Sequence, residues 1–240
     1  MGTKLVYLPV DYARHDDVYR RLRARGATGW DAAMQYDTLL GLVAPTLPAL
    51  TSESPPRILE LGSGAGDLSL LLAARGYIVT GVDISRTAVD WANERLSVSS
   101  ANPSFRVDNV VDLATCSSGS FDAVVDGRCL HCIIGDDRSR CLAAVRRVLK
   151  PGGLLVVISM CGEVLDETRR AQFDPVTNIL ADDGRPSRYI GGADAIVSEV
   201  LKAGFDIEDV HIEPRRSTLE QDDVVIAARR ADTTVAGIHD

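Results

Sequence analysis

The sequence has no uncharged apolar run that is long enough to cross a lipid bilayer. Its two candidates, residues 38–50 and 154–161, are shorter than the ~20 residues that a transmembrane helix needs. The chain reaches Pro9 and Asp11 after only a few apolar side chains, so it offers no hydrophobic core for a signal peptide. We therefore expect a cytoplasmic protein that makes no contact with membranes.

Basic side chains are also in short supply. The 26 lysines and arginines are outnumbered by 34 aspartates and glutamates, which gives a net charge of −8 at pH 7. This excess of negative charge disfavours extended contact with nucleic acid or with anionic lipids. We expect a small molecule as the partner, and no nucleic acid.

Cysteine is scarce and odd in number. Five cysteines in a chain without a secretion signal argue against a disulfide framework. Cys129 and Cys132 form a Cys-x-x-Cys pair, but no second close pair of cysteine or histidine completes the four ligands of a structural zinc site. We expect buried thiols there, and no metal.

From residue 57 onward, short apolar segments alternate with longer amphipathic segments. Strands are predicted at 57–61, 77–83, 105–108, 121–126, 154–159, 205–212 and 224–228, and helices at 67–75, 86–96, 136–149 and 194–203. Strands separated by segments of helical length are typical of βαβ units. The sequence therefore predicts an α/β fold, in which a doubly wound, seven-stranded and mostly parallel sheet has helices on both faces.

The predicted α/β domain covers residues 57–230, and a helical cap with a linker precedes it over residues 1–56. Helix-type spacing marks residues 16–25 and 31–50 within that cap. The cap lies outside the βαβ pattern and is expected to cover the sheet.

Two more segments depart from the pattern. Residues 162–190 mix glycine, proline and charged side chains with a weak helical signal, which indicates a lid or an insertion. Residues 231–240 are expected to form a tail.

A loop rich in glycine follows the first predicted strand. Gly62, Gly64 and Gly66 carry no Cβ atom, so the backbone can turn sharply there and approach a ligand closely. In a dinucleotide-binding loop the third glycine would stand at position 67, where this chain has Asp67. A carboxylate at that position would repel a pyrophosphate group. The loop therefore favours a ligand without a diphosphate.

Carboxylates end the next two predicted strands. Asp83 lies 21 residues after Gly62, where an acidic group can accept hydrogen bonds from both hydroxyls of a ribose. Asp108 ends the third strand and can accept from an exocyclic amine such as that of adenine, with an ordinary Asx turn as the alternative. Together with the loop, these residues indicate a nucleoside as the ligand.

Four short segments form a set in their order and separation. They are 58–66 (Ile-Leu-Glu-Leu-Gly-Ser-Gly-Ala-Gly), 82–85 (Val-Asp-Ile-Ser), 120–125 (Ser-Phe-Asp-Ala-Val-Val) and 148–153 (Val-Leu-Lys-Pro-Gly-Gly). This set resembles the class I S-adenosylmethionine (SAM)-dependent methyltransferases, well over residues 57–160 and loosely over 190–230. The resemblance implies a Rossmann-like sheet whose last strand is antiparallel. It also implies SAM as the cofactor and S-adenosylhomocysteine (SAH) as the cofactor product.

The resemblance assigns cofactor-binding roles to residues of these segments. Glu60 would approach the methionine amino group, Asp83 would hold the ribose hydroxyls, and Asp108 would meet the adenine amine. The other implied cofactor-binding residues are Gly62, Ser63, Gly64 and Gly66 in the loop, Ile84 on adenine, Asn109 beside Asp108, and Asp126 next to the methionine moiety. Acidic residues agree with a cationic sulfonium cofactor.

The segment after the fourth predicted strand carries the candidate catalytic residue. His131 lies where the acceptor would approach, and histidine ordinarily titrates near neutral pH, so it could act as a general base toward a hydroxyl. A structural histidine is the alternative. Arg128 could pair with an acidic substrate, with Asp126, or with neither.

Aromatic residues are few and unevenly placed. The chain has 2 Trp, 6 Tyr and 4 Phe, and five of them lie in the first 36 residues, namely Tyr7, Tyr12, Tyr19, Trp30 and Tyr36. Such a cap could close the site or stack on a substrate. We expect Tyr36 near the cofactor and Trp30 and Tyr19 near the substrate, with packing of the cap on the sheet as the alternative for each.

The leading hypothesis is a SAM-dependent methyltransferase of the EC 2.1.1 type. It would move the sulfonium methyl group to a hydroxyl, amine or similar nucleophile of a small molecule by in-line displacement, which mainly requires placing the two reactants together without water. The first alternative is a nucleotide-dependent oxidoreductase on a Rossmann-like fold, against which Asp67 argues. The second is a non-catalytic binding protein that kept the SAM-binding fold.

Overall fold

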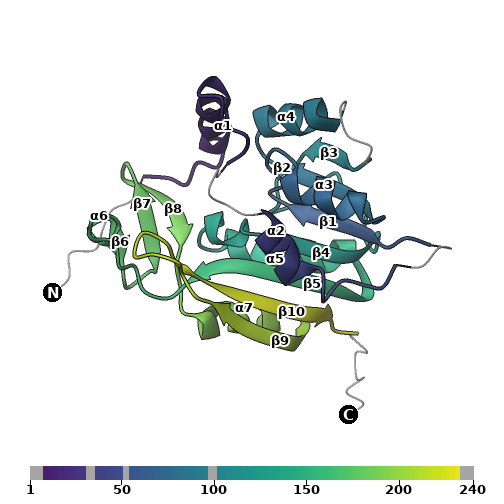
Figure 1. Cartoon of the computed structure of the whole chain (residues 1–240). Helices are drawn as coiled ribbons and strands as arrows, with labels where there is room; N and C mark the ends of the chain where they lie inside the picture. The colour runs from purple at the N-terminus through teal and green to yellow at the C-terminus, as the bar shows by residue number, and fades with distance from the viewer. Residues whose placement is uncertain (1–7, 31–35, 51–53, 97–101, 233–240) are drawn as a thin grey trace, which may run out of the picture.

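The centre of the molecule is a seven-stranded sheet (Figure 1). This computed structural model describes residues 8–30, 36–50, 54–96 and 102–232, with the backbone alone at 36 and 37. The strands lie in the order β3 (Ser104–Val107), β2 (Ile78–Asp83), β1 (Arg57–Leu61), β4 (Phe121–Gly127), β5 (Leu149–Cys161), β10 (Asp222–Arg230) and β9 (Phe205–Glu213). Strand β10 is antiparallel to both of its neighbours, and the other neighbouring pairs are parallel. The predicted doubly wound, mostly parallel sheet is confirmed.

Helices cover both faces of this sheet. They are α2 (Tyr36–Val43) and α3 (Asp67–Ala74) on one face, α5 (Asp137–Val148) and α7 (Ala193–Lys202) on the other, and α4 (Arg86–Leu96) beside β3. Because successive side chains of a strand point to opposite faces, Ile58 belongs to the apolar cluster with α2 and α3, whereas Leu59 belongs to the cluster with α5 and α7. Both faces of β1 are therefore buried, as in other parallel sheets. No helix in the described part of the chain is long and apolar enough to cross a membrane.

The order of the strands reverses between β1 and β4. From β1 the chain proceeds to β2 and β3 on one side, and from β4 it proceeds to β5 on the other. In open α/β sheets, ligands bind beyond the carboxyl ends of the strands at such a reversal. The fold therefore predicts a ligand site at the carboxyl ends of β1, β2 and β4.

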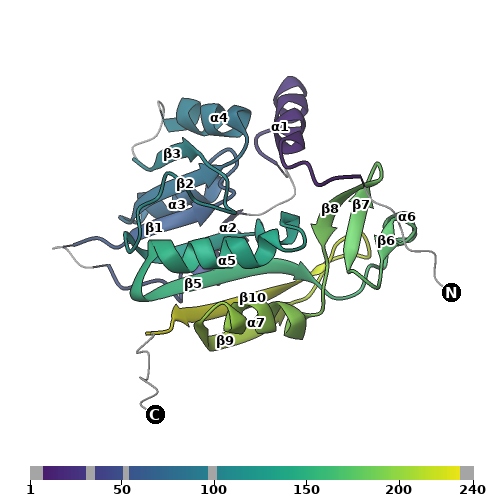
Figure 2. The same cartoon turned by 180° about the vertical axis from the view of Figure 1, so that it is seen from behind.

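Helix α1 (Arg14–Ala24) lies beside α4, as both views of the cartoon show (Figures 1 and 2). One carboxylate oxygen of Asp16 accepts hydrogen bonds from Ser85 Oγ at 2.7 Å and from the backbone N–H of Thr87 at 2.8 Å. Ser85 Oγ also accepts from the backbone N–H of Ala88 at 3.0 Å and thereby caps α4. These bonds hold α1 against the end of β2. The division of the chain at residue 56 stays a prediction.

Residues 162–190 form a second, small sheet, which the weak helical signal does not predict. After the single turn α6 (Glu167–Arg170), strands β6 (Phe173–Asp174), β7 (Ile179–Asp182) and β8 (Arg185–Tyr189) pair in antiparallel fashion. The small sheet has its own buried cluster of Val164, Leu180 and Ile190. Whether this insertion acts as a lid stays a prediction.

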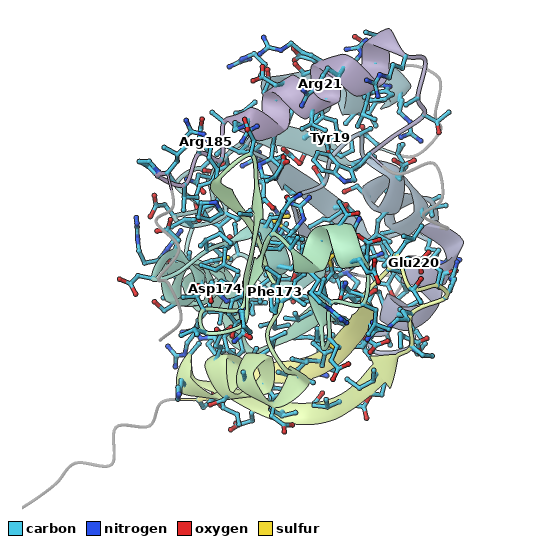
Figure 3. The ribbon with its side chains drawn as sticks, turned by 90° about the vertical axis from the view of Figure 1, so that its left-hand side faces the viewer. Tyr19, Arg21, Phe173, Asp174, Arg185 and Glu220 are labelled. Atoms are coloured by element: carbon cyan, nitrogen blue, oxygen red, sulfur yellow. The ribbon has the colours of Figure 1, made fainter. Side chains whose placement is uncertain are left out.

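The N-terminal segment is hydrogen-bonded to the small sheet. The backbone N–H of Leu8 donates to the Gly184 carbonyl oxygen at 3.1 Å, and the Arg185 guanidinium donates to the Pro9 carbonyl oxygen at 3.2 Å. Figure 3 looks onto this side of the molecule and shows Arg185 near the start of α1, with Tyr19 further along the helix. The N-terminal segment and the insertion thus lie side by side, although they are far apart in the sequence.

Candidate functional site

A pocket opens beyond the carboxyl ends of β1, β2 and β4, where the strand order reverses. The predicted site residues in its lining are Trp30, Glu60, Gly62, Ser63, Asp83, Ile84, Asn109, Arg128 and His131. The predicted residues Tyr19, Gly64, Gly66, Asp108 and Asp126 are not in its lining. Tyr36 begins α2, and its side chain lies outside the part that the structure describes.

Two glycines of the loop between β1 and α3 approach their neighbours closely. Gly62 has φ +61°, and a Cβ atom on it would lie 2.8 Å from Cys129 Sγ. Gly64 has φ +53°, and a Cβ atom there would lie 2.5 Å from Tyr19 Oη. The left-handed backbone and the lack of space both require glycine at these positions. The backbone N–H of Gly64 donates to Asp83 Oδ2 at 2.9 Å, which joins the loop to the end of β2.

Glu60 and Asp83 place two buried carboxyl groups in the pocket wall, with exposed fractions of 4% and 6%. The Ser69 hydroxyl donates to Glu60, and the backbone N–H of Ser85 donates to Asp83 at 2.8 Å. Burial raises the pKa of Glu60 to about 8 and the pKa of Asp83 to about 6, and neighbouring carboxylates add to both shifts. A bound cation would relieve the cost of ionising these groups.

Asp126 shapes the turn that follows β4. One of its oxygens accepts from the backbone N–H groups of Cys129 and Leu130, at 2.6 and 3.0 Å. The other oxygen is buried and has no hydrogen-bond partner among the described residues. Burial raises the pKa of Asp126 to about 7. The turn leads into the short 3₁₀ helix η1 (Leu130–Cys132), which carries His131.

Asp108 has both carboxylate oxygens engaged within the loop that follows β3. Its Oδ1 accepts from the backbone N–H groups of Asn109 and Ala114, at 2.8 and 3.2 Å. Its Oδ2 accepts from the backbone N–H and the hydroxyl of Thr115, at 2.9 and 2.6 Å. Two donors on each oxygen favour a structural role of Asp108 within its own loop, although none of them is the N–H two residues on that an Asx turn would use, and Asn109 is the residue of this pair that lines the pocket.

Asp67 stands at the start of α3 and forms an ion pair. Its Oδ1 lies 2.7 Å from Nη2 of Arg95, and the two side chains are only partly exposed. The guanidinium compensates the negative charge that the sequence argument sets against a pyrophosphate group. In the folded protein Asp67 therefore disfavours a pyrophosphate group less than its position in the sequence predicts.

His131 lies in a basic part of the pocket. Its side chain is 3% exposed, and its Nδ1 atom has no hydrogen-bond partner among the described residues. Burial and the nearby Arg188 and Arg128 guanidinium groups lower the pKa of His131 well below its ordinary value. The expectation that His131 titrates near neutral pH is therefore corrected, because the structure holds this imidazole neutral at pH 7.

Several lining residues have no counterpart among the predicted site residues. They are Tyr12, His15, Leu39, Val110, Gly127, Cys129, Cys132, Ile133, Met160 and Arg188. The aromatic clustering in the first 36 residues pointed to Tyr12, whose hydroxyl donates to Asp137 at 3.1 Å and accepts from the Ile134 N–H at 3.1 Å. No sequence signal indicated Arg188, because it lies on a strand of the insertion that the weak helical signal does not predict.

Burial raises the pKa of both Cys129 and Cys132, and no group of metal-ligating side chains occurs in the described residues.

Fold and site together define a Rossmann-like α/β protein. Its ligand pocket is built from a glycine loop and two buried acids at the point where the strand order reverses. This arrangement suits a nucleoside-like ligand that carries hydroxyl donors and positive charge.

Comparison with known proteins agrees with this class. Residues 59–157 match the family described as a methyltransferase domain. The ubiquinone biosynthesis O-methyltransferase of Xanthomonas oryzae pv. oryzae (strain PXO99A) is 36% identical over 104 residues, which are 43% of this chain and 43% of that protein. A SAM-dependent methyltransferase structure from Methanosarcina mazei has a TM-score of 0.67 and 24% identity, and the match covers 79% of this chain and 97% of that one. The Burkholderia thailandensis 1,6-didemethyltoxoflavin-N1-methyltransferase, with bound 1,6-didemethyltoxoflavin and SAH, has a TM-score of 0.67 and 18% identity, covering 95% and 94% of the two chains.

These comparisons support the class I SAM-dependent methyltransferase superfamily for this chain, with SAM as the cofactor. The match spans 43% of the length of the curated Xanthomonas relative. The structural relatives, which are less than 25% identical, establish the shared fold.

Proposed function

We propose that this protein transfers a methyl group from SAM to a hydroxyl, amine or similar nucleophile of a small molecule. The observation that carries the proposal is the pair of buried carboxyl groups, Glu60 and Asp83, in one pocket at the reversal of the strand order. A buried carboxylate is stabilised by a ligand that brings hydroxyl donors or positive charge. A nucleoside with a sulfonium group brings both.

The residues of the pocket fit such a ligand. Each oxygen of Asp83 accepts one backbone hydrogen bond and keeps a second lone pair, which a ribose hydroxyl would use. Glu60 would face the ammonium group of the methionine moiety. Ile84 and Asn109 would flank the adenine, whereas Asp108 would shape their loop and not bind the amine.

When bound, SAM supplies a methyl group that its positively charged sulfur already activates. The chain then has to hold the acceptor in line with the methyl group and exclude water. Trp30, Ile133 and Met160 provide apolar walls for the acceptor. His131 would accept the proton of a hydroxyl acceptor, although its lowered pKa makes it a weak base.

Calorimetric titration with SAH and with NADH tests the proposal. We expect the purified protein to bind SAH with a dissociation constant on the order of micromolar and not to bind NADH. Binding of NADH in place of SAH would support the nucleotide-dependent oxidoreductase. If SAH binds but no labelled methyl group passes from SAM to any member of a panel of phenols, amines and thiols, the protein is a non-catalytic binder and the proposal is wrong.

Replacement of His131 by alanine should slow transfer to a hydroxyl acceptor and leave the SAH affinity within about twofold. We expect kcat to fall about tenfold, less than the usual 10²–10⁴-fold contribution of a general base, because burial and two arginines oppose protonation of this imidazole. Steady-state kinetics measures the effect. His211, exposed on β9 and outside the pocket lining, gives the control variant His211→Ala. Normal turnover of the His131 variant would reject the base role.

A further inference from the structure

The ionisable groups of the pocket separate by charge. Around Glu60 and Asp83, the nearby charges that contribute most to the pKa shifts are other carboxylates. Around His131, they are the guanidinium groups of Arg188 and Arg128. The pocket therefore has an acidic part, which the proposed function uses, and a basic part formed by Arg128, His131 and Arg188.

Arg188 reaches the pocket from β8 of the small sheet. Its guanidinium carbon lies 6.0 Å from the centre of the Trp30 ring, and its Nη1 donates to the Ser187 carbonyl oxygen at 2.7 Å. No carboxylate of the described residues forms an ion pair with it. A planar guanidinium without a carboxylate partner, next to an aromatic wall, is suited to hold a planar anion.

Arg128 lines the pocket with its backbone in an unfavourable conformation. It follows β4 directly and has φ +74°, which is rare for a residue with a side chain. Such conformations persist only where the surrounding structure fixes them, and they cluster at functional sites. Its Nε atom is buried without a hydrogen-bond partner among the described residues, and its Nη2 lies 3.5 Å from Asp223 Oδ1.

His131 adds a second unpaired group. It is 3% exposed, it lines the pocket, and its Nδ1 atom has no partner in the described part of the chain. A buried polar atom without a partner is rare in folded proteins and points to a ligand or to ordered water. Two such atoms, Arg128 Nε and His131 Nδ1, occur in this basic part of the site.

Resting on the proposed function, we infer that Arg188 and Arg128 bind a carboxylate of the methyl acceptor, with the unpaired imidazole of His131 left to the acceptor's hydroxyl, so that the substrate is a small organic acid. The apolar walls around Trp30 and Ile133 suit an aromatic ring that carries this group. The two parts of the pocket would then hold two ligands of opposite charge, and each ligand would be excluded from the other's place.

The methionine moiety of the cofactor also carries a carboxylate, which is the other group that the basic part of the pocket would bind. His131 follows β4, and Arg188 comes from an insertion that adds nothing to the acidic part of the pocket. We therefore assign the basic part to the acceptor. A variant of Arg188 separates the two sources, because it weakens either acceptor binding or SAH binding.

The test compares 4-hydroxybenzoate with its uncharged counterpart 4-hydroxybenzamide. Each is titrated into the full-length protein, with and without saturating SAH, and binding is followed by calorimetry. We expect the carboxylate to bind at least tenfold more tightly than the amide. Arg188→Gln should abolish this preference and leave the SAH dissociation constant within about twofold, and Arg188→Lys should keep part of the preference.

Arg185→Gln is the matched control, because Arg185 lies on the same strand, is not in the pocket lining and donates to the Pro9 carbonyl oxygen. This variant should retain the preference for the carboxylate. Equal binding of both probes, or of neither, to the unsubstituted protein would overturn the inference. A tenfold loss of SAH affinity in Arg188→Gln would assign the arginine to the cofactor and overturn it as well. A preference for the carboxylate without any binding of SAH would support the anion site and reject the proposed methyltransferase function.

Discussion

Replacement of Gly64 by valine should abolish the binding of SAH. Gly64 has φ +53°, and a Cβ atom there would lie 2.5 Å from Tyr19 Oη, so the valine variant must displace either the loop or α1. The loop also carries the Gly64 N–H that donates to Asp83, so its displacement removes a hydrogen bond that positions the carboxylate proposed to bind the ribose. We expect an affinity loss of at least ~100-fold, about 2.8 kcal/mol at 1.4 kcal/mol per factor of ten, measured by calorimetry.

Gly119 supplies the control for backbone strain. It has φ +60° and no heavy atom within 4 Å of a Cβ position, so Gly119→Val pays a similar conformational cost without a collision. Both variants should unfold at a lower temperature, but only the Gly64 variant should lose SAH binding.

A double substitution isolates the collision itself. Tyr19→Phe removes the hydroxyl and leaves the ring atom Cζ, 3.4 Å from the Cβ position, as the nearest neighbour. In the milder Gly64→Ala background this change should restore most of the SAH affinity. If Tyr19→Phe does not raise the SAH affinity of Gly64→Ala, the affinity loss has a cause other than the collision with the Tyr19 hydroxyl.

The acidic part of the site could be predicted because it depends on local rules. Strand ends of a parallel sheet meet at one edge, so the residues that close β1 and β2 come together whatever else the chain does. Glu60 and Asp83 accordingly share the pocket with Gly62. The bounds of β1 are predicted to the residue, since an apolar run bounded by a proline-rich linker and a glycine loop has little freedom.

Residue type alone could not decide whether a strand-end carboxylate faces a ligand or its own loop. Asp83 and Asp108 occupy equivalent positions at the ends of β2 and β3. The donors of Asp83 leave a lone pair on each oxygen, whereas four donors from the Asp108 loop occupy both oxygens of Asp108. That difference depends on how the chain returns after β3, and no short pattern encodes it.

The basic part of the site depends on contacts between distant segments. Arg188 comes from a strand of only five residues in an insertion whose mostly half-buried strands show no alternation of buried and exposed residues. Its position follows from pairing with β7 and from contacts with the N-terminal segment, which lies more than 150 residues away in the sequence. Sequence periodicity identifies elements that bury a face in the main core, and this small sheet has a separate core of its own.

Asp83→Asn should lower the SAH affinity about 100-fold at pH 7.5. The amide keeps the shape of the side chain but replaces one acceptor by a donor and removes the charge from the other. Two hydrogen bonds to a charged group, each worth roughly 1.5 kcal/mol, together correspond to about 100-fold. Asp67→Asn is the matched control, because Asp67 lies in the adjacent loop, pairs with Arg95 and does not line the pocket. The control should bind SAH within about threefold of the unsubstituted protein.

The pH dependence of SAH binding separates the Asp83 carboxylate from a general loss of structure. The pKa of Asp83 is raised to about 6, so its carboxylate protonates as the pH falls through that value and then no longer accepts two hydroxyl hydrogens. The unsubstituted protein should therefore lose affinity between pH 7.5 and pH 5, and Asp83→Asn, with no proton to gain, should lose little more over that range. A variant that declines in parallel with the unsubstituted protein would place the titrating group elsewhere, since Asp126 and Glu60 also titrate above their ordinary range. Their pKa values of about 7 and 8 lie within or above the tested range, so the difference between the two proteins, and not the decline itself, identifies Asp83 as the titrating group.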